Sequence, residues 1–146
     1  MNDFNTGIYL LQIHLKDDDI IKTGALGKFK YNKGFYFYIG SAQNNLNSRI
    51  ERHLSKDKKF YWHIDYLLDR AKIIEYVIFN AKKTFECSLF NNLKESDVFK
   101  VPIKGFGASD CTCISHLLYS KEKIDLSRHL RQVKQEYRII KPGVKN

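Results

Sequence analysis

Two tripeptides decide the fold of this chain: Gly7-Ile8-Tyr9, which opens an apolar run that ends at Leu15, and Tyr38-Ile39-Gly40, which closes an aromatic run. Runs of this kind are typical of pleated β-strands. Side chains alternate between the two faces of a strand, so each tyrosine shares a face with the glycine of its own tripeptide. A glycine beside an aromatic ring leaves space for another backbone or a ligand. The two phenols could therefore flank a small pocket, although tyrosines more often pack a core.

The rest of the chain predicts alternating strands and helices. The acidic cluster at residues 17–19 indicates a turn, with a return strand at residues 20–21 and a glycine-rich loop at 24–34. Helical spacing begins at Leu46 and stops near Lys56, while residues 60–68 fit either a helix or a strand. We expect a strand at 73–79, a helix at 85–93, an irregular stretch at 101–119 that ends in a strand, and a C-terminal helix at 125–140.

These elements predict an α/β (α+β) domain with a small central sheet, mixed or antiparallel, flanked by helices. We place this domain at residues 6–120 and a basic helical C-terminal extension at residues 121–146. A chain of 146 residues is long enough for one domain with such an appendage.

Composition favours a polyanionic partner. Lys and Arg number 25 against 16 Asp and Glu, which gives a net charge of +9. Each phosphate that such a protein neutralises releases condensed counterions, so nucleic acid is the favoured partner over an anionic membrane. No apolar run approaches the ~20 residues of a membrane span, and the first residues lack the features of a secretory signal. We expect a cytoplasmic protein in which the three cysteines stay reduced.

Three polar residues follow the second tripeptide in an order that favours chemistry. Arg49 and His53 are four residues apart, so a helix presents both on one face. Glu86 lies at the start of a later predicted helix. A carboxylate at that position is also favoured by the helix dipole alone, without any catalytic role.

The order of these motifs resembles the GIY-YIG nuclease superfamily, and the resemblance implies that superfamily's fold. The closer resemblance, over residues 6–119, is to an uncharacterised archaeal and bacterial branch that is sometimes fused to an endonuclease III-like DNA glycosylase domain. Besides Tyr38 to Ala42, the matching stretches are Arg49-Ile50-Glu51-Arg52-His53, Trp62-His63-Ile64-Asp65-Tyr66 and Gly105-Phe106-Gly107-Ala108-Ser109-Asp110-Cys111.

The resemblance implies a metal-dependent endonuclease that hydrolyses a phosphodiester bond in nucleic acid. Glu86 would hold one Mg²⁺ or Mn²⁺ ion, since hard cations prefer oxygen ligands. Arg49 would offset charge that grows on the phosphate, and Tyr9 would orient or deprotonate the attacking water. Tyr38 would position these groups, and His53 would relay a proton or contact phosphate. The alternative is a non-catalytic nucleic-acid-binding module that keeps the fold.

The predicted partner is nucleic acid, with DNA favoured over RNA, and DNA-repair proteins are candidate partners as well. Side chains expected to contact the nucleic acid are Ser41, Arg52, Lys58, Lys59 and His63. The pair His63 and Asp65 is equally compatible with a structural hydrogen bond. Basic residues of the predicted C-terminal helix could add phosphate contacts, namely Arg128, Arg131, Lys134 and Arg138.

Two features depart from the superfamily pattern. The spacer between Tyr9 and Tyr38 is longer than in the better-known members and has to hold an extra hairpin or loop at residues 16–34. No late asparagine has a clear equivalent; the possible stand-ins are Asn91, Asn92, Ser109 and Asp110.

The cysteines suggest a third hypothesis for the function, after the nuclease and the binding module: a zinc-stabilised interaction protein. Cys87, Cys111, Cys113 and His116 carry ligand atoms that zinc prefers. If residues 111–116 form a strand, however, His116 points away from the two nearby cysteines. We therefore favour buried thiols over a zinc site.

Overall fold

A five-stranded antiparallel sheet forms the middle of the computed structural model, which describes residues 6–108 and 113–143. The strand order is β6-β4-β1-β5-β7, and every neighbouring pair is antiparallel. The strands are β1 (Gly7–Leu15), β4 (Gly34–Ala42), β5 (Lys72–Phe79), β6 (Leu117–Ser120) and β7 (Tyr137–Ile140). The fold is thus a mixed α+β fold, and its sheet is the antiparallel one of the two predicted alternatives.

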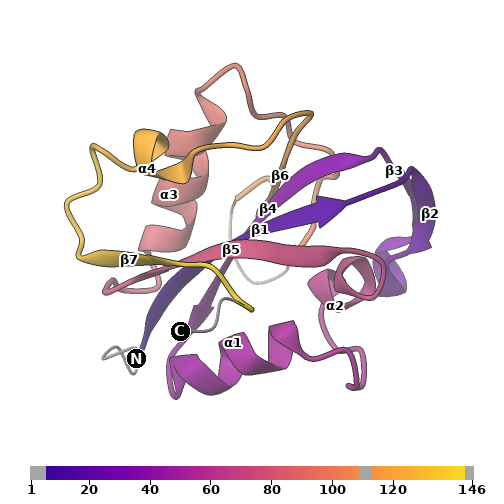
Figure 1. Cartoon of the computed structure of the whole chain (residues 1–146), viewed down its shortest axis with the longest axis horizontal. Coiled ribbons are helices and arrows are strands. Elements are labelled where there is room, and N and C mark those ends of the chain that lie inside the picture. Colours follow the sequence, from indigo (N-terminus) through magenta and orange to yellow (C-terminus); the bar gives the residue numbers. More distant parts are fainter. Residues whose placement is uncertain (1–5, 109–112, 144–146) are drawn as a thin grey trace.

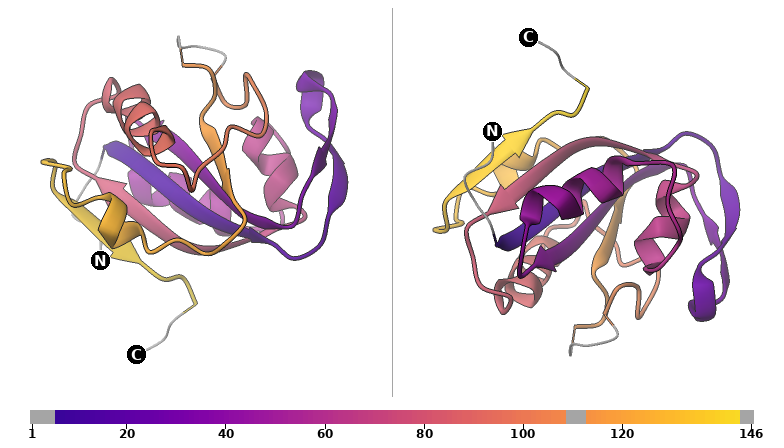
Figure 2. Two further views of the ribbon diagram at one scale, coloured as in Figure 1. Left: turned by 90° about the horizontal axis from the view of Figure 1, so that it is seen from above. Right: turned by 90° about the horizontal axis from the view of Figure 1, so that it is seen from below.

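Helices cover both faces of this sheet (Figures 1 and 2). On one face lie α1 (Leu46–Leu54) and α2 (His63–Leu68), and on the other lie α3 (Phe85–Lys94) and α4 (Leu126–His129). The two-residue period of β1 explains the arrangement, since Tyr9 and Leu11 pack in the core with α1 and α2. Ile8 and Leu10 pack in the opposite core with α3. The central strand is therefore buried on both faces.

The long spacer between the tyrosine motifs forms an extra hairpin. Its strands are β2 (Asp19–Lys22) and β3 (Lys28–Tyr31), joined by a 3₁₀ turn, η1 (Gly24–Leu26). The predicted return strand is confirmed, but it pairs with β3 instead of β1. The prediction that residues 24–34 are a loop is wrong for residues 28–31, which form β3. The glycines on either side drew attention away from the alternation of exposed and buried side chains in this short strand.

The predicted helix at residues 125–140 is also wrong. Only the four residues of α4 are helical, and β7 pairs with β5 at the edge of the central sheet. The apolar residues at helical spacing, including Leu126 and Leu130, do pack into one core, but from a short helix and the turns after it. Residues 121–143 therefore return to the sheet and do not form a helical extension.

The remaining predicted elements agree with the structure. The predicted helices match α1 and α3, the predicted strand at 73–79 matches β5, and β6 is the expected strand after the irregular stretch. The ambiguous segment at 60–68 contains α2. Within residues 6–108 and 113–143, no helix is long and apolar enough to cross a membrane.

Candidate active-site cleft

The two tyrosine motifs meet across neighbouring strands. Tyr9 of β1 lies opposite Gly40 of β4, and Leu11 lies opposite Tyr38. A Cβ atom added to Gly40 would lie 2.4 Å from Cζ of Tyr9, so the ring of Tyr9 occupies the space that the glycine leaves. The centroids of the Tyr9 and Tyr38 rings are 6.3 Å apart. The tyrosine of the first motif therefore depends on the glycine of the second motif, because only glycine leaves room for its ring.

A loop after α3 encloses Tyr38 from another side. Gly107 has a φ of +68°, and a Cβ atom there would lie 2.8 Å from Cε1 of Tyr38. Its backbone N–H donates to Nδ1 of His63 at 2.9 Å, so that nitrogen is the acceptor of the ring. Glycine is required here both by the left-handed backbone and by the close approach of the tyrosine.

These elements border a cleft of about 260 Å³. The residues that line it are Tyr9, Tyr38, Gly40, Ser41, Arg49, Tyr61, Trp62, His63, Lys83, Glu86, Gly107 and His116. Six predicted site residues are among them, and they come from β1, β4, α1, α2 and α3. Segments nearly 80 residues apart in the chain thus meet at one concave surface.

Of the residues predicted to be catalytic, His53 lies behind the cleft instead of lining it. Its Nε2 is hydrogen-bonded to the Tyr9 hydroxyl at 2.7 Å, and its side chain is only 2% exposed. Nδ1 has no hydrogen-bond partner among the described residues. Burial, with the positive charge of Lys58 next in effect, lowers the pKa of His53 to about 3. The ring is therefore neutral near neutral pH. It contacts the cleft residues from behind, through its hydrogen bond to Tyr9 and its packing against the rings of Tyr38 and Trp62.

Both tyrosines of the cleft are held in the neutral form. Burial raises the pKa of Tyr9 to about 12, and the charge and hydrogen bond of Arg49 only partly oppose that effect. Burial also raises the pKa of Tyr38 well above its ordinary value, and the neighbouring Tyr9 and Glu86 act in the same direction. Neither phenol is therefore poised to act as a base on its own, and both are hydrogen-bonding hydroxyls.

Arg49 of α1 brings positive charge to the cleft. Its Nη1 donates to the backbone carbonyl of Ser41 at 2.9 Å, which ties the helix to the end of β4. Its guanidinium lies 4.5 Å from the centroid of the Trp62 ring, within the range of a cation–π interaction. The side chain is thus held in place from two sides at the cleft wall.

Two residues predicted to contact nucleic acid have structural partners in this fold. Arg52 makes a two-pronged ion pair with the buried Asp65, at 2.9 and 3.0 Å. The ammonium of Lys58 donates to the backbone carbonyls of Arg52 and His53 and is 7% exposed. The two side chains therefore stabilise the end of α1 and the turn before α2. The side chain of Lys59, the third lysine or arginine predicted to contact nucleic acid, is exposed.

Glu86 lies in the first turn of α3, as predicted, and its side chain is 6% exposed. Its charge contributes to the raised pKa values of Tyr9 and Tyr38. A carboxylate at the wall of the cleft supplies one oxygen ligand of the kind that Mg²⁺ and Mn²⁺ prefer.

Sequence reasoning missed Tyr61 and Lys83 as cleft residues. Tyr61 is 81% exposed at the cleft, beside the Trp62 ring. An exposed aromatic residue in a turn has no periodic signal, and nothing in the sequence distinguishes Lys83 from the adjacent Lys82. Of the stand-ins for a late asparagine, Asn91 and Asn92 are exposed and do not line the cleft, while Ser109 and Asp110 lie outside the described residues.

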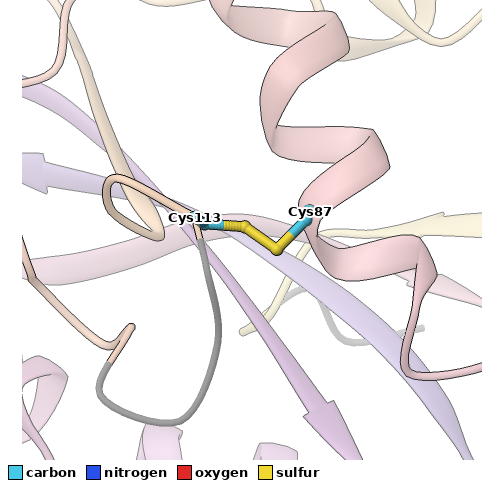
Figure 3. The surroundings of a disulfide bond; sticks show 2 residues. All are labelled: Cys87 and Cys113. Atoms are coloured by element: carbon cyan, nitrogen blue, oxygen red, sulfur yellow. A yellow bond between two sulfur atoms is a disulfide. The ribbon is translucent and has the colours of Figure 1, made fainter.

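The cysteines differ from the expectation of reduced, buried thiols. Cys87 of α3 and Cys113 form a disulfide, with Cα atoms 5.8 Å apart (Figure 3). His116 lies beside them. Residues 113–116 are not in a strand, since β6 begins at Leu117, so the alternation that would turn His116 away from Cys113 does not apply. Cys111 lies outside the described residues.

A family model described as "Domain of unknown function DUF123" matches residues 8–139. The chain belongs to this DUF123 family. The DUF123 match runs from β1 into β7 and so includes every residue that lines the cleft. No curated protein and no solved structure matched the chain.

Proposed function

We propose that this protein is a metal-dependent endonuclease of the GIY-YIG type that hydrolyses a phosphodiester bond in nucleic acid, with DNA favoured over RNA. The observation that carries the proposal is the convergence of Tyr9, Arg49 and Glu86 on one cleft. These residues come from three elements, and each has the chemistry that phosphodiester hydrolysis requires.

Arg49 would stabilise negative charge on the phosphate. Its guanidinium lines the cleft and is held by the carbonyl of Ser41 and the ring of Trp62. A donor fixed in advance costs no reorganisation when charge grows on the phosphoryl oxygens. Removing such a donor typically lowers the rate by about 10²–10³.

Tyr9 would orient the attacking water as a neutral hydroxyl. Its bond to His53 fixes the direction of the phenol, and its oxygen can also accept a hydrogen bond from water in the cleft. His53 would then be a positioning residue, because a ring with a pKa of about 3 is a poor proton acceptor. The earlier expectation that Tyr9 deprotonates water would require an additional positive charge beside it.

Glu86 would hold the divalent cation. One carboxylate is a weak metal site alone, so water and substrate phosphate would complete the oxygen ligands. The bound cation would polarise the phosphoryl group and stabilise the leaving oxygen. The residues fit this ion because a nearly buried carboxylate faces an open, polar cleft that also contains Arg49 and Lys83.

Tyr61 and Lys59 would guide the nucleic acid toward the cleft. An exposed aromatic ring offers a stacking surface for an unpaired base, and each stacked base is worth about 1–3 kcal/mol. The net charge of +9 adds attraction to the phosphate backbone.

Cleavage assays with matched variants test the proposal. Plain, branched, damaged and single-stranded DNA, and RNA, would be incubated with Mg²⁺ or Mn²⁺. Glu86→Gln should abolish cleavage because it removes the metal ligand, whereas Glu95→Gln at the exposed end of α3 should not. Tyr9→Phe should greatly reduce cleavage, whereas Tyr36→Phe removes another buried hydroxyl outside the cleft and should retain it.

Cleavage that persists in Glu86→Gln would show that another site or another protein is responsible. Binding without cleavage on all substrates and with both metals would establish the alternative, a non-catalytic nucleic-acid-binding module. One observation favours that alternative, since Tyr9 is 1% exposed and its pKa is raised to about 12.

A further inference from the structure

Three side chains with ligand atoms suited to a softer metal meet beside the cleft. The sulfur atoms of Cys87 and Cys113 and a ring nitrogen of His116 all lie within 4.8 Å of one another. In a tetrahedral zinc site, with Zn–S near 2.3 Å and Zn–N near 2.0 Å, ligand atoms are roughly 3.5–3.8 Å apart. Opening the sulfur–sulfur bond would let the two sulfur atoms separate, and side-chain rotations would then adjust all three atoms toward these zinc distances.

We propose that, in the reduced protein, Cys87, Cys113 and His116 bind one Zn²⁺ ion in a site separate from Glu86. Two thiolates and one imidazole form a ligand set that selects zinc over magnesium or manganese, which prefer oxygen ligands. A fourth ligand, such as water, completes a tetrahedron. The inference does not depend on nuclease activity, because it concerns metal content and stability.

The disulfide is the oxidised form of the same pair of cysteines (Figure 3). Two equivalents of a small thiol reductant break the sulfur–sulfur bond, leave two protein thiols and form one disulfide of the reductant. Zinc binding then releases the two thiol protons to solvent, since thiolates are the ligands. Disulfide and zinc are therefore mutually exclusive at this position.

The position gives the ion a structural effect on the cleft. Cys87 follows Glu86 on α3, and His116 lines the cleft. The backbone of His116 donates to the carbonyl of Phe106 at 2.8 Å and accepts from the N–H of Ile39 at 3.0 Å. Zinc would thus join the start of α3 to the loop that carries Gly107 and to β4, two walls of the same cleft.

Metal analysis of the whole chain tests the inference. Protein purified under reducing conditions, with Cys111→Ser so that its only thiols are those of Cys87 and Cys113, would be loaded with Zn²⁺, desalted and measured for zinc per chain. We expect one zinc per chain and a thiolate-to-metal charge-transfer band when Co²⁺ replaces it. Protein with the disulfide closed should bind neither ion.

Variants of each ligand make the result specific. Cys87→Ser, Cys113→Ser and His116→Gln should each lose zinc and the cobalt band, whereas His129→Gln, at the end of α4, should keep both. Zinc should raise the melting temperature of the parent protein but not that of the ligand variants. This comparison also detects any variant that fails to fold. Reduced protein without zinc and without a cobalt band, or zinc retained in Cys87→Ser, would overturn the proposal.

Discussion

Tyr9 and Gly40 depend on each other at the scale of single residues. A Cβ atom at position 40 would lie 2.4 Å from the Tyr9 ring and its hydroxyl oxygen. We predict that Gly40→Ala lowers the free energy of unfolding by about 1–3 kcal/mol, the usual cost of overpacking a core. Chemical denaturation measures this cost.

The clash with Tyr9 is tested by a double-mutant cycle. In a Tyr9→Ala background the added methyl group meets no ring, so the cost of Gly40→Ala should largely disappear. An equal cost in both backgrounds would show that the effect comes from the backbone of β4 and not from the tyrosine.

His53 makes the stability of the protein depend on pH. The folded protein holds this ring neutral, with a pKa of about 3 against an ordinary value of 6.5. Between these values the unfolded chain binds a proton that the folded protein does not, so stability falls as pH falls below 6.5. At about pH 5 the loss due to His53 should be roughly 2 kcal/mol.

The measurement compares His53→Gln with the parent protein across this range. Glutamine does not titrate, so the free energy of unfolding of the variant should decline less from neutral pH to about pH 5. Parallel pH profiles of the two proteins would show that His53 is not held neutral by the fold. Carboxylates common to both proteins cancel in the difference.

At the scale of elements, α1 and α2 are joined by one buried ion pair. Asp65 is fully buried and accepts hydrogen bonds from Arg52 and from the backbone N–H groups of Tyr61 and Trp62. Burial alone would raise the pKa of Asp65, but the hydrogen bond from Arg52, followed by those backbone N–H groups, lowers it overall. The carboxylate is therefore ionised, and removing Arg52 would leave a buried charge with incomplete compensation.

We predict that Arg52→Ala destabilises the protein by about 3–5 kcal/mol, the range for breaking a buried ion pair from one side. The matched control is Arg70→Ala, because Arg70 pairs with Asp19 and Asp69 at the exposed surface. Its cost should be about 0–1 kcal/mol. Equal costs of the two substitutions in denaturation experiments would contradict the structural role given to Arg52.

At the scale of the whole molecule, we expect the net positive charge to govern binding of nucleic acid. With a net charge of +9, affinity for a short DNA or RNA should fall steeply as salt rises, since each phosphate contact releases counterions. Glu86→Gln should leave this affinity unchanged or slightly higher, because it removes a negative charge beside the phosphate. Fluorescence anisotropy over a salt series measures both effects.

Two further outcomes are informative in the same binding series. Tyr61→Ala should weaken binding of single strands by roughly 5- to 150-fold, the scale of one lost stacking interaction. Absence of binding to either nucleic acid at low salt would contradict the proposed nuclease and the binding module together.

The sequence by itself determined the elements whose signals are local. The aromatic run of residues 35–39 predicted β4, and the helical spacing after Leu46 predicted α1. The helix predicted to begin beside Glu86 was confirmed as α3. The spacing of Arg49 and His53 placed both on one helix face, and both contact Tyr9 in the structure. Short-range periodicity is sufficient for such assignments, because it reflects which face of an element is buried.

Only the tertiary structure decided which residues border the cleft and which support it. The same helix face presents Arg49 to the cleft and buries His53 behind Tyr9. Arg52 and Lys58 have a buried partner that no local pattern predicts.

The C-terminal strand was also decided by tertiary structure. Residues 137–140 pair with the open edge of β5, although their local spacing resembles that of a helix. The contact of Cys87 with Cys113 and His116 also depends on tertiary structure, because the chain between α3 and β6 has to return to the sheet. In each case the partner is distant in sequence, and packing and backbone pairing between distant segments outweigh local preference.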